Sequence, residues 1–295
     1  MKPLEGKQDR AGLAILLTLA ALFCFAGIDT SAKWLITAGV APIVVVFFRY
    51  AGHLTISLAL AVAQRDPAIF RMKRPRLTLA RGALLLGATT MNFLSLVHLP
   101  LTVTVSIFFT MPLMTTVLAA IFLKEQVGPR RWTAVAIGLI GILVITQPWA
   151  ASFHWAMFLT LLATFFTAIY SLLTRAIAGE EDPQTMQLYA SLLPAIALAP
   201  FAIWGWTAPS GAIDWAFCIL IGICGWGGHQ LYIRALRYAE ASALAPYTYA
   251  QIIFMTSASW LIFHHPPDFW TMVGAAIVAG SGLYIWLREQ TLARA

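Results

Sequence analysis

The chain has 295 residues, of which 60% are hydrophobic and 11% are charged, with a formal net charge of +7. A soluble protein of this length carries about twice that charged fraction, so the composition argues against a soluble globular protein and predicts an all-α integral membrane protein. The basic residues stand in short clusters between apolar runs rather than in a stripe among aromatic residues, which argues against nucleic-acid binding.

Ten apolar runs follow one another along the chain, each near the length of about 20 residues that crosses the hydrocarbon core as a helix. In chain order, the predicted transmembrane helices span residues 12–36, 41–63, 77–98, 101–123, 131–147, 152–176, 185–204, 213–236, 242–263 and 269–288. Glycine and proline mark the short linkers, as at Gly39 with Pro42 and at Gly128 with Pro129. The first run is too long for a signal-peptide core and is interpreted as a retained helix.

Lysine and arginine alternate between the two sides of this predicted bundle. Basic residues follow helices 2, 4, 6 and 8 and occur at both termini, whereas the linkers after helices 1, 3, 5, 7 and 9 contain none. Lys and Arg favour the cytoplasmic side of a membrane, so we predict that both termini are cytoplasmic. The richest linker is the one after helix 2, with Arg65, Arg71, Lys73, Arg74 and Arg76.

The two halves of the chain repeat each other at a nearly constant offset. Leu17–Lys33 lies over Leu159–Arg175, since both begin Leu-Thr-Leu and end in a cation, and Trp132–Val135 lies over Trp270–Val273. Each half holds five helices, an odd number, so the halves enter the membrane from opposite sides as an inverted repeat. We therefore expect one five-helix repeat over residues 1–148 and a second over residues 149–295.

One family pattern is visible in both halves. Leu99–Ile145 begins with a short polar link, continues through a helix that starts with small residues, and reaches an acidic turn, KEQ, before a Gly-rich helix. Ala239–Ile285 repeats this order but carries HHPP at the turn. The chain resembles the EamA-type transporters of the drug/metabolite transporter superfamily. Within that family it looks most like the bacterial aromatic amino acid exporters, which implies a location in a bacterial inner membrane.

Three charged residues stand inside predicted helices. Asp29 and Lys33 are four residues apart on one face of helix 1, and Arg49 lies at nearly the same depth in helix 2. A charge inside the membrane costs at least a few kcal/mol, so such residues pair with one another, face a cavity, or do both. Two interpretations stay open, namely an Asp29–Arg49 or Asp29–Lys33 pair that ties helices together and a substrate or proton site.

A second polar group is expected in the inner half of helices 6 to 9. Tyrosine near helix ends is typical of the interfacial belt, an alternative that stays open for Tyr189 and Tyr247. Amide and imidazole groups need a hydrogen-bond partner away from lipid, so they indicate a cavity or a helix contact. Asn92 of helix 3 aligns with a residue of this group, Tyr232, at the repeat offset. The candidate substrate-binding residues here are Tyr170, His229, Gln230, Tyr232, Tyr249 and Gln251, with Phe108, Phe109 and Trp226 as a candidate aromatic wall.

Two prolines and two pairs of small residues concern helix packing. Pro112 and Pro194 fall near the middles of helices 4 and 7, where proline bends a helix, and they are candidate hinges as well as candidate packing kinks. Small-xxx-small pairs in helices 5 and 10 predict close packing, with a homodimer through these helices as the alternative. The small residues are Ala134, Gly138, Ala276 and Gly280.

The sequence predicts a carrier and no enzyme. It has no paired intramembrane Asp, no GxSxG and no phosphate loop, and His264 with His265 lacks metal-ligand spacing, so no catalytic residue, metal or cofactor is expected. We predict a secondary transporter that exports amino acids, aromatic and other neutral ones, by alternating access, with a small-molecule substrate and the lipid bilayer as its partners. A transporter or exchanger of another small metabolite or drug is the first alternative, and a channel is the second.

Overall fold

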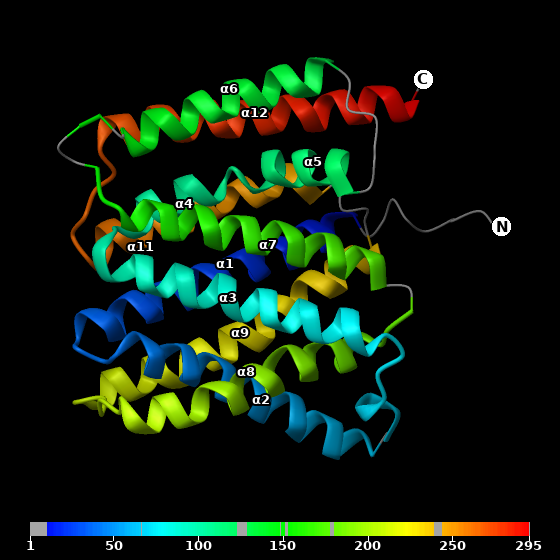
Figure 1. Ribbon diagram of the computed structural model, residues 1–295, viewed down its shortest axis with the longest axis vertical. Helices are drawn as coiled ribbons and strands as arrows, with labels where there is room; N and C mark the ends of the chain where they lie inside the picture. Colours follow the sequence, from blue (N-terminus) through cyan, green and yellow to red (C-terminus); the bar gives the residue numbers. More distant parts are fainter. Residues whose placement is uncertain are drawn as a thin grey trace.

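The computed structural model describes residues 11–65, 67–122, 129–147, 149–150, 153–177, 180–238 and 244–294. Helices make up most of these segments and run side by side in one bundle (Figure 1). In chain order they are α1 (Ala11–Thr37), α2 (Pro42–Gln64), η2 (Pro67–Phe70), α3 (Pro75–His98), α4 (Leu101–Phe108), α5 (Met111–Phe122), α6 (Pro129–Thr146), α7 (Ala156–Ile177), α8 (Pro183–Trp204), α9 (Ala212–Tyr238), η3 (Ala245–Ala250), α11 (Gln251–Leu261) and α12 (Phe269–Arg294).

These elements account for the ten predicted crossings. Among the described residues, α1, α2, α3, α7, α8 and α9 contain apolar stretches long enough to cross a membrane, and α6 and α12 contain shorter apolar stretches. The fourth crossing is divided into α4 and α5, and the ninth is divided into the 3₁₀ helix η3 and α11. Large apolar side chains such as Phe23, Ile203 and Trp204 are exposed on the outside, as a lipid-facing surface requires. The fold prediction of an all-α, ten-helix membrane protein is confirmed.

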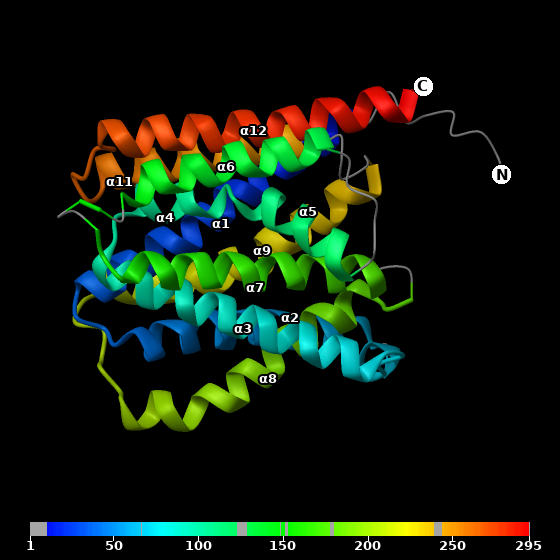
Figure 2. The ribbon, with the colours of Figure 1, turned by 45° about the horizontal axis from the view of Figure 1, so that its top comes forward.

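Helix contacts follow the symmetry of an inverted repeat. In the alignment of the halves, α1 corresponds to α7 and α3 corresponds to α9. Helix α1 packs along α9 and α3 packs along α7, so these two contacts are equivalent under the repeat. The pairs α2–α8, α4–α11 and α6–α12 join each helix to its own counterpart. Figures 1 and 2 show α6 and α12 together at one edge of the bundle.

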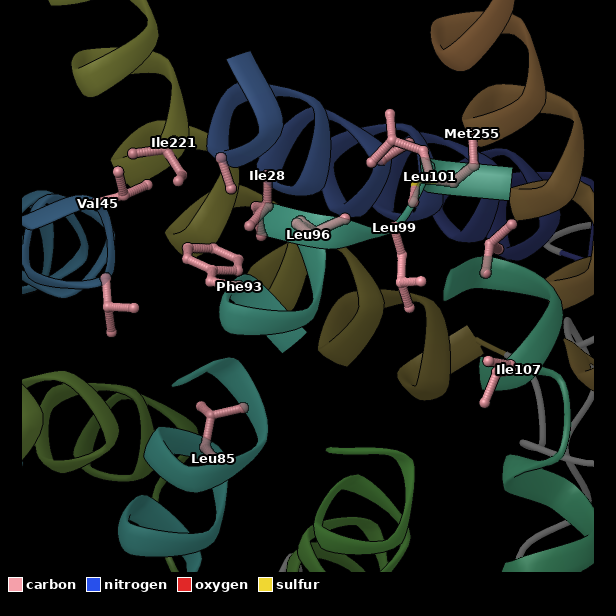
Figure 3. Packing of buried hydrophobic residues seen from close by; sticks show 14 of the residues in the cluster. Ile28, Val45, Leu85, Phe93, Leu96, Leu99, Leu101, Ile107, Ile221 and Met255 are labelled. Atoms are coloured by element: carbon pink, nitrogen blue, oxygen red, sulfur yellow. The ribbon is translucent and has the colours of Figure 1, made fainter. Parts of the chain in front are cut away.

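The two halves share one hydrophobic core. A single cluster of buried side chains includes Ile28, Val45 and Phe93 of the first half and Ile221 and Met255 of the second (Figure 3). The start of α1, the end of α12 and the linker that contains η2 lie at the same end of the bundle (Figure 1). This arrangement agrees with the alternation of basic linkers, and the assignment of that end to the cytoplasm stays a prediction.

Small residues allow close crossings, at positions that differ in part from the predicted ones. A Cβ atom added to Gly274 of α12 would lie 2.7 Å from the Gly141 oxygen of α6, so these two glycines make the α6–α12 crossing. Gly138 is covered by the Leu113 side chain, whereas no atom of the described residues lies within 4 Å of a Cβ added to Gly280. The prediction that Ala276 and Gly280 pack inside the chain is wrong, because both are exposed.

Candidate functional site

A small cavity lies between the two halves at Asp29. It measures about 60 Å³ and is lined by side chains of α1, α4 and α11. The Asn92 amide of α3 donates a hydrogen bond to Asp29 Oδ1 at 2.8 Å, which fixes the carboxylate at the cavity wall. The second half contributes Gln251, the first residue of α11. The lining residues are Asp29, Val105, Phe108, Gln251 and Met255.

Irregular backbone borders this cavity from both halves. Helix α4 ends at Phe108 and α5 begins at Met111, with Phe109 and Thr110 between them. Pro112 has no N–H to donate to the carbonyl of Phe108, which favours a break at this point. The contacting element α11 is preceded by the 3₁₀ helix η3. Pro194, in contrast, lies within the uninterrupted helix α8.

An aromatic pair joins the two irregular segments. The rings of Phe109 and Tyr249 meet edge to face with their centroids 5.2 Å apart. The Tyr249 hydroxyl lies against Gly282 of α12, where a Cβ atom would collide with it. Sequence reasoning selected both aromatic residues, and the structure brings them together next to the cavity rather than into its lining.

Lys33 makes a different contact from the one expected. Its Nζ donates to the carbonyl oxygens of Leu96 at 2.6 Å and Leu99 at 3.0 Å, so it holds the C-terminal end of α3 against α1. Among the described residues, the ion pair within 4.0 Å is the one between Arg74 and Glu180. A direct pair of Asp29 with Lys33 or Arg49 is therefore wrong for this conformation, because Asn92 holds the carboxylate instead.

Arg49 is buried without a full set of acceptors. Its side chain is 5% exposed, and its guanidinium carbon lies 4.6 Å above the centre of the Tyr50 ring. Atom Nη1 is buried and has no hydrogen-bond partner in the part of the chain that the structure describes. Asp29 is within electrostatic reach of this guanidinium but makes no contact with it. One turn further along α2, His53 is 1% exposed, and neither of its ring nitrogens makes a hydrogen bond within 3.5 Å to a described residue.

Sequence reasoning missed Arg81, which ties α3 to two helices of the second half. Its Nε donates to Thr174 Oγ1 at 2.7 Å, its Nη2 to the Tyr170 hydroxyl at 2.6 Å and its Nη1 to the carbonyl of Met186 at 3.0 Å. The guanidinium also lies 4.5 Å from the centre of the Tyr170 ring. The available signal was a charged residue inside an apolar run, the same kind of signal that drew attention to Asp29.

The predicted inner group is partly assembled. The His229 ring lies 6.2 Å from the His53 ring and 6.4 Å from the Tyr170 ring. Gln230 accepts a long hydrogen bond of 3.4 Å from Gln187. Tyr232, three residues beyond His229 on α9, is half-buried and outside the lining of the Asp29 cavity. The structure therefore forms two adjoining polar groups, as expected, but divides the residues differently, with the first group around Asp29 and Gln251 and the second around Arg49 and His229.

Both halves of the chain match one family of proteins. The model of the EamA-like transporter family matches residues 12–147 and again residues 154–287. A riboflavin transporter of Vibrio cholerae is 32% identical over 61% of this chain, and the match spans 61% of that protein's length. An S-adenosylmethionine uptake transporter of Rickettsia bellii is 28% identical over 83% of this chain and 84% of its own.

More distant similarity extends along nearly the whole chain. A pseudopaline exporter of Pseudomonas aeruginosa is 23% identical over 90% of this chain and 92% of its own. A solved crystal structure is 17% identical and superimposes with a TM-score of 0.64 over 92% of this chain and 98% of that one. This last likeness concerns the fold alone.

Proposed function

This chain belongs to the EamA-like transporter family, and we propose that it carries a small organic metabolite through the space between its two repeats by alternating access. The observation that carries the proposal is the cavity at Asp29, because the first repeat supplies the carboxylate and the second supplies Gln251. Secondary transporters with inverted repeats bind their substrates at this kind of interface. We take the repeats to span residues 1–148 and 149–295.

The chemistry of the cavity supports a ring-bearing polar solute. Asp29 offers a carboxylate oxygen, Gln251 offers an amide with both a donor and an acceptor, and Phe108 offers an aromatic face. An offset-stacked ring contributes about 0.5–1.5 kcal/mol beyond its buried area. The relatives named above move riboflavin, S-adenosylmethionine and pseudopaline, so they favour a metabolite of this kind over the aromatic amino acids that the sequence suggested.

The size of the cavity supports a mechanism with moving helices. A pocket for a drug-sized ligand measures about 300–1,000 Å³, whereas this cavity measures about 60 Å³. A metabolite of that size therefore enters only when the surrounding helices separate. The break between α4 and α5 and the 3₁₀ segment η3 border the cavity and are the points where we propose that the movement is concentrated, with Pro112 as a hinge residue.

Flux measurements on reconstituted vesicles test this function. Labelled riboflavin, S-adenosylmethionine, phenylalanine and alanine are each measured in both directions, with and without unlabelled solute on the opposite side. We expect saturable flux with counterflow for a ring-bearing metabolite, and roughly tenfold weaker apparent affinity in Asp29→Asn, the effect of losing one good hydrogen bond to a charged group. Arg76→Gln, at an exposed position, is the control.

Two results would count against the proposal. Unsaturable flux without counterflow would indicate a channel. Normal flux in Asp29→Asn would remove Asp29 from the site even if the carrier function stood.

A further inference from the structure

The buried arginines of the interior differ in how many protein hydrogen-bond acceptors their guanidinium groups have. Arg81 is 2% exposed and its three nitrogens all donate to protein acceptors. Lys33 likewise reaches two backbone carbonyls. Arg49, at 5% exposure, has a buried Nη1 without any acceptor and no carboxylate within 4.0 Å among the described residues. A buried cation without a partner is costly in a membrane, and such residues usually serve a function.

A second group without partners lies next to Arg49. Both ring nitrogens of His53 are buried, and neither makes a hydrogen bond within 3.5 Å among the described residues, with the Gln187 side chain as the polar group near the ring. The two side chains flank Gly225 of α9, where an added Cβ would lie 3.8 Å from Arg49 Cγ and 4.0 Å from His53 Nδ1. A neutral imidazole carries one donor and one acceptor, so His53 adds an N–H to the free N–H of Arg49. Arg49 Nη1 and the His53 ring, on one face of α2, thus make no hydrogen bond within 3.5 Å to any described residue and can meet an acceptor from a solute.

We propose that Arg49 and His53 form a subsite for a carboxylate of the transported solute, which deepens the transport function proposed above and rests on it. The planar guanidinium matches a carboxylate with two parallel N–H donors. One free guanidinium balances one negative charge, whereas a phosphate brings nearly two. The second buried arginine of this region, Arg81, is already bound by Thr174, Tyr170 and Met186, so the subsite fits a carboxylate better than a phosphate.

The position of the subsite also defines the solute. Asp29 is within electrostatic reach of Arg49, and its carboxylate lines the neighbouring cavity. A solute that spans both groups presents a hydrogen-bond donor or a cation to Asp29 and a carboxylate to Arg49. The substrate class that follows is an amphoteric organic acid, with its ring or chain against the apolar wall at Phe108.

Two matched pairs of probes test the subsite. S-adenosylmethionine and its decarboxylated form differ by one carboxylate, and riboflavin and its 5′-phosphate differ by one phosphate. Binding to the purified protein is measured by thermal shift and calorimetry, and flux is measured in vesicles. We expect the carboxylate to strengthen binding by about 10- to 100-fold in the wild type, and the phosphate to give no such gain.

The variants separate a binding role from a structural one. Arg49→Gln is expected to fold with an unchanged or higher melting temperature and to bind both members of the first pair equally. Arg49→Lys, which keeps the charge but not the planar fork, is expected to retain part of the preference. The control Arg76→Gln lies on an exposed surface and is expected to retain all of it.

Each outcome decides between the proposals. A carboxylate preference that survives in Arg49→Gln, or an Arg49→Gln protein that fails to fold, would overturn the subsite. Equal binding of both members in the wild type would do the same, even with normal flux. Arg49-dependent carboxylate binding without any flux would overturn the transport function and leave the subsite in place. Stronger binding of riboflavin 5′-phosphate than of riboflavin, lost in Arg49→Gln, would overturn the carboxylate assignment and indicate a phosphate subsite.

Discussion

Arg81 and Arg49 form a natural pair for a stability test, because both are buried arginines of the first half and only Arg81 has protein acceptors for all three of its nitrogens. Substituting glutamine for Arg81 removes three hydrogen bonds to Thr174, Tyr170 and Met186 and the contact with the Tyr170 ring. The same substitution at Arg49 loses only the contact of the guanidinium with Tyr50, because the buried Nη1 has no acceptor among the described residues. The two variants should therefore differ strongly.

The expected size of the difference follows from the contacts. A hydrogen bond to a charged group contributes about 1.5–3 kcal/mol in soluble proteins, and polar contacts between membrane helices average about 0.6 kcal/mol. Three such bonds put the cost of Arg81→Gln at roughly 2–5 kcal/mol. At about 2–4 °C per kcal/mol, the melting temperature falls by roughly 4–20 °C. For Arg49→Gln the lost ring contact of about 1 kcal/mol is offset by the removal of a buried charge without a counter-ion.

The assay is thermal unfolding of the detergent-purified variants without added solute, followed by loss of the monodisperse peak on size exclusion. The wild type and Arg76→Gln provide the reference. Equal losses in Arg81→Gln and Arg49→Gln would refute the reasoning, and so would a larger loss in Arg49→Gln. Either result would mean that the hydrogen bonds of Arg81 do not decide the stability of the interface between α3, α7 and α8.

Two further predictions concern the linkers and the helix crossings. Arg74 lowers the pKa of Glu180 from its ordinary value of 4.5, first by its hydrogen bond and then by its charge. This pair therefore stabilises the fold above pH 4.5 and loses its effect as the pH falls below that value. Glu180→Gln should flatten the decline of the melting temperature below pH 4.5, and a decline equal to that of the wild type would contradict this prediction. A Cβ atom on Gly52 would lie 2.7 Å from the Gly222 Cα atom, so Gly52→Ala should lower the free energy of unfolding by about 1–3 kcal/mol. At Gly280 no described atom lies within 4 Å of the added Cβ, so Gly280→Ala should be neutral or stabilising by up to about 1 kcal/mol. Equal melting temperatures for the two alanine variants would contradict the close crossing, and a selective loss of dimer in Gly280→Ala would reveal an intermolecular role for α12.

The number and direction of the helices could be predicted from the sequence because both depend on one-dimensional patterns. Apolar run length fixes the crossings, and the repeat from Leu17–Lys33 to Leu159–Arg175 fixes the inversion. The break after Phe108 could not be predicted in the same way. Pro112 and Pro194 have the same intrinsic effect on a helix, yet one adjoins a break and the other lies in a continuous helix. Packing against neighbouring helices decides between these outcomes.

The candidate site shows the same limit at the level of side chains. Depth along a helix identified Asp29 and Arg49 as unusual, since a charge at that depth needs an explanation. Their partners depend on how each helix is rotated about its axis, which depth does not specify. The carboxylate therefore meets Asn92, and Lys33 meets two carbonyls. Arg81 was missed because it lies near the start of α3, where a cation resembles those of the basic linker before it.

The helices obey the repeat symmetry, but the charges do not, and this difference has a consequence for transport. At the repeat offset, the positions of Asp29, Arg49 and Arg81 are occupied in the second half by Ser171, Leu188 and Ile221. The α3–α7 contact is therefore held by two hydrogen bonds from the Arg81 guanidinium, whereas its counterpart, the α1–α9 contact, lacks the equivalent arginine and has a hydrogen bond from Trp34 Nε1 to Asp214 Oδ1 at 3.0 Å. Separating α3 from α7 therefore breaks a different set of hydrogen bonds from separating α1 from α9. A symmetric fold with asymmetric charges thus favours one of its two access states, and Arg81→Gln should shift that balance toward the other, as cysteine accessibility at the two ends would report.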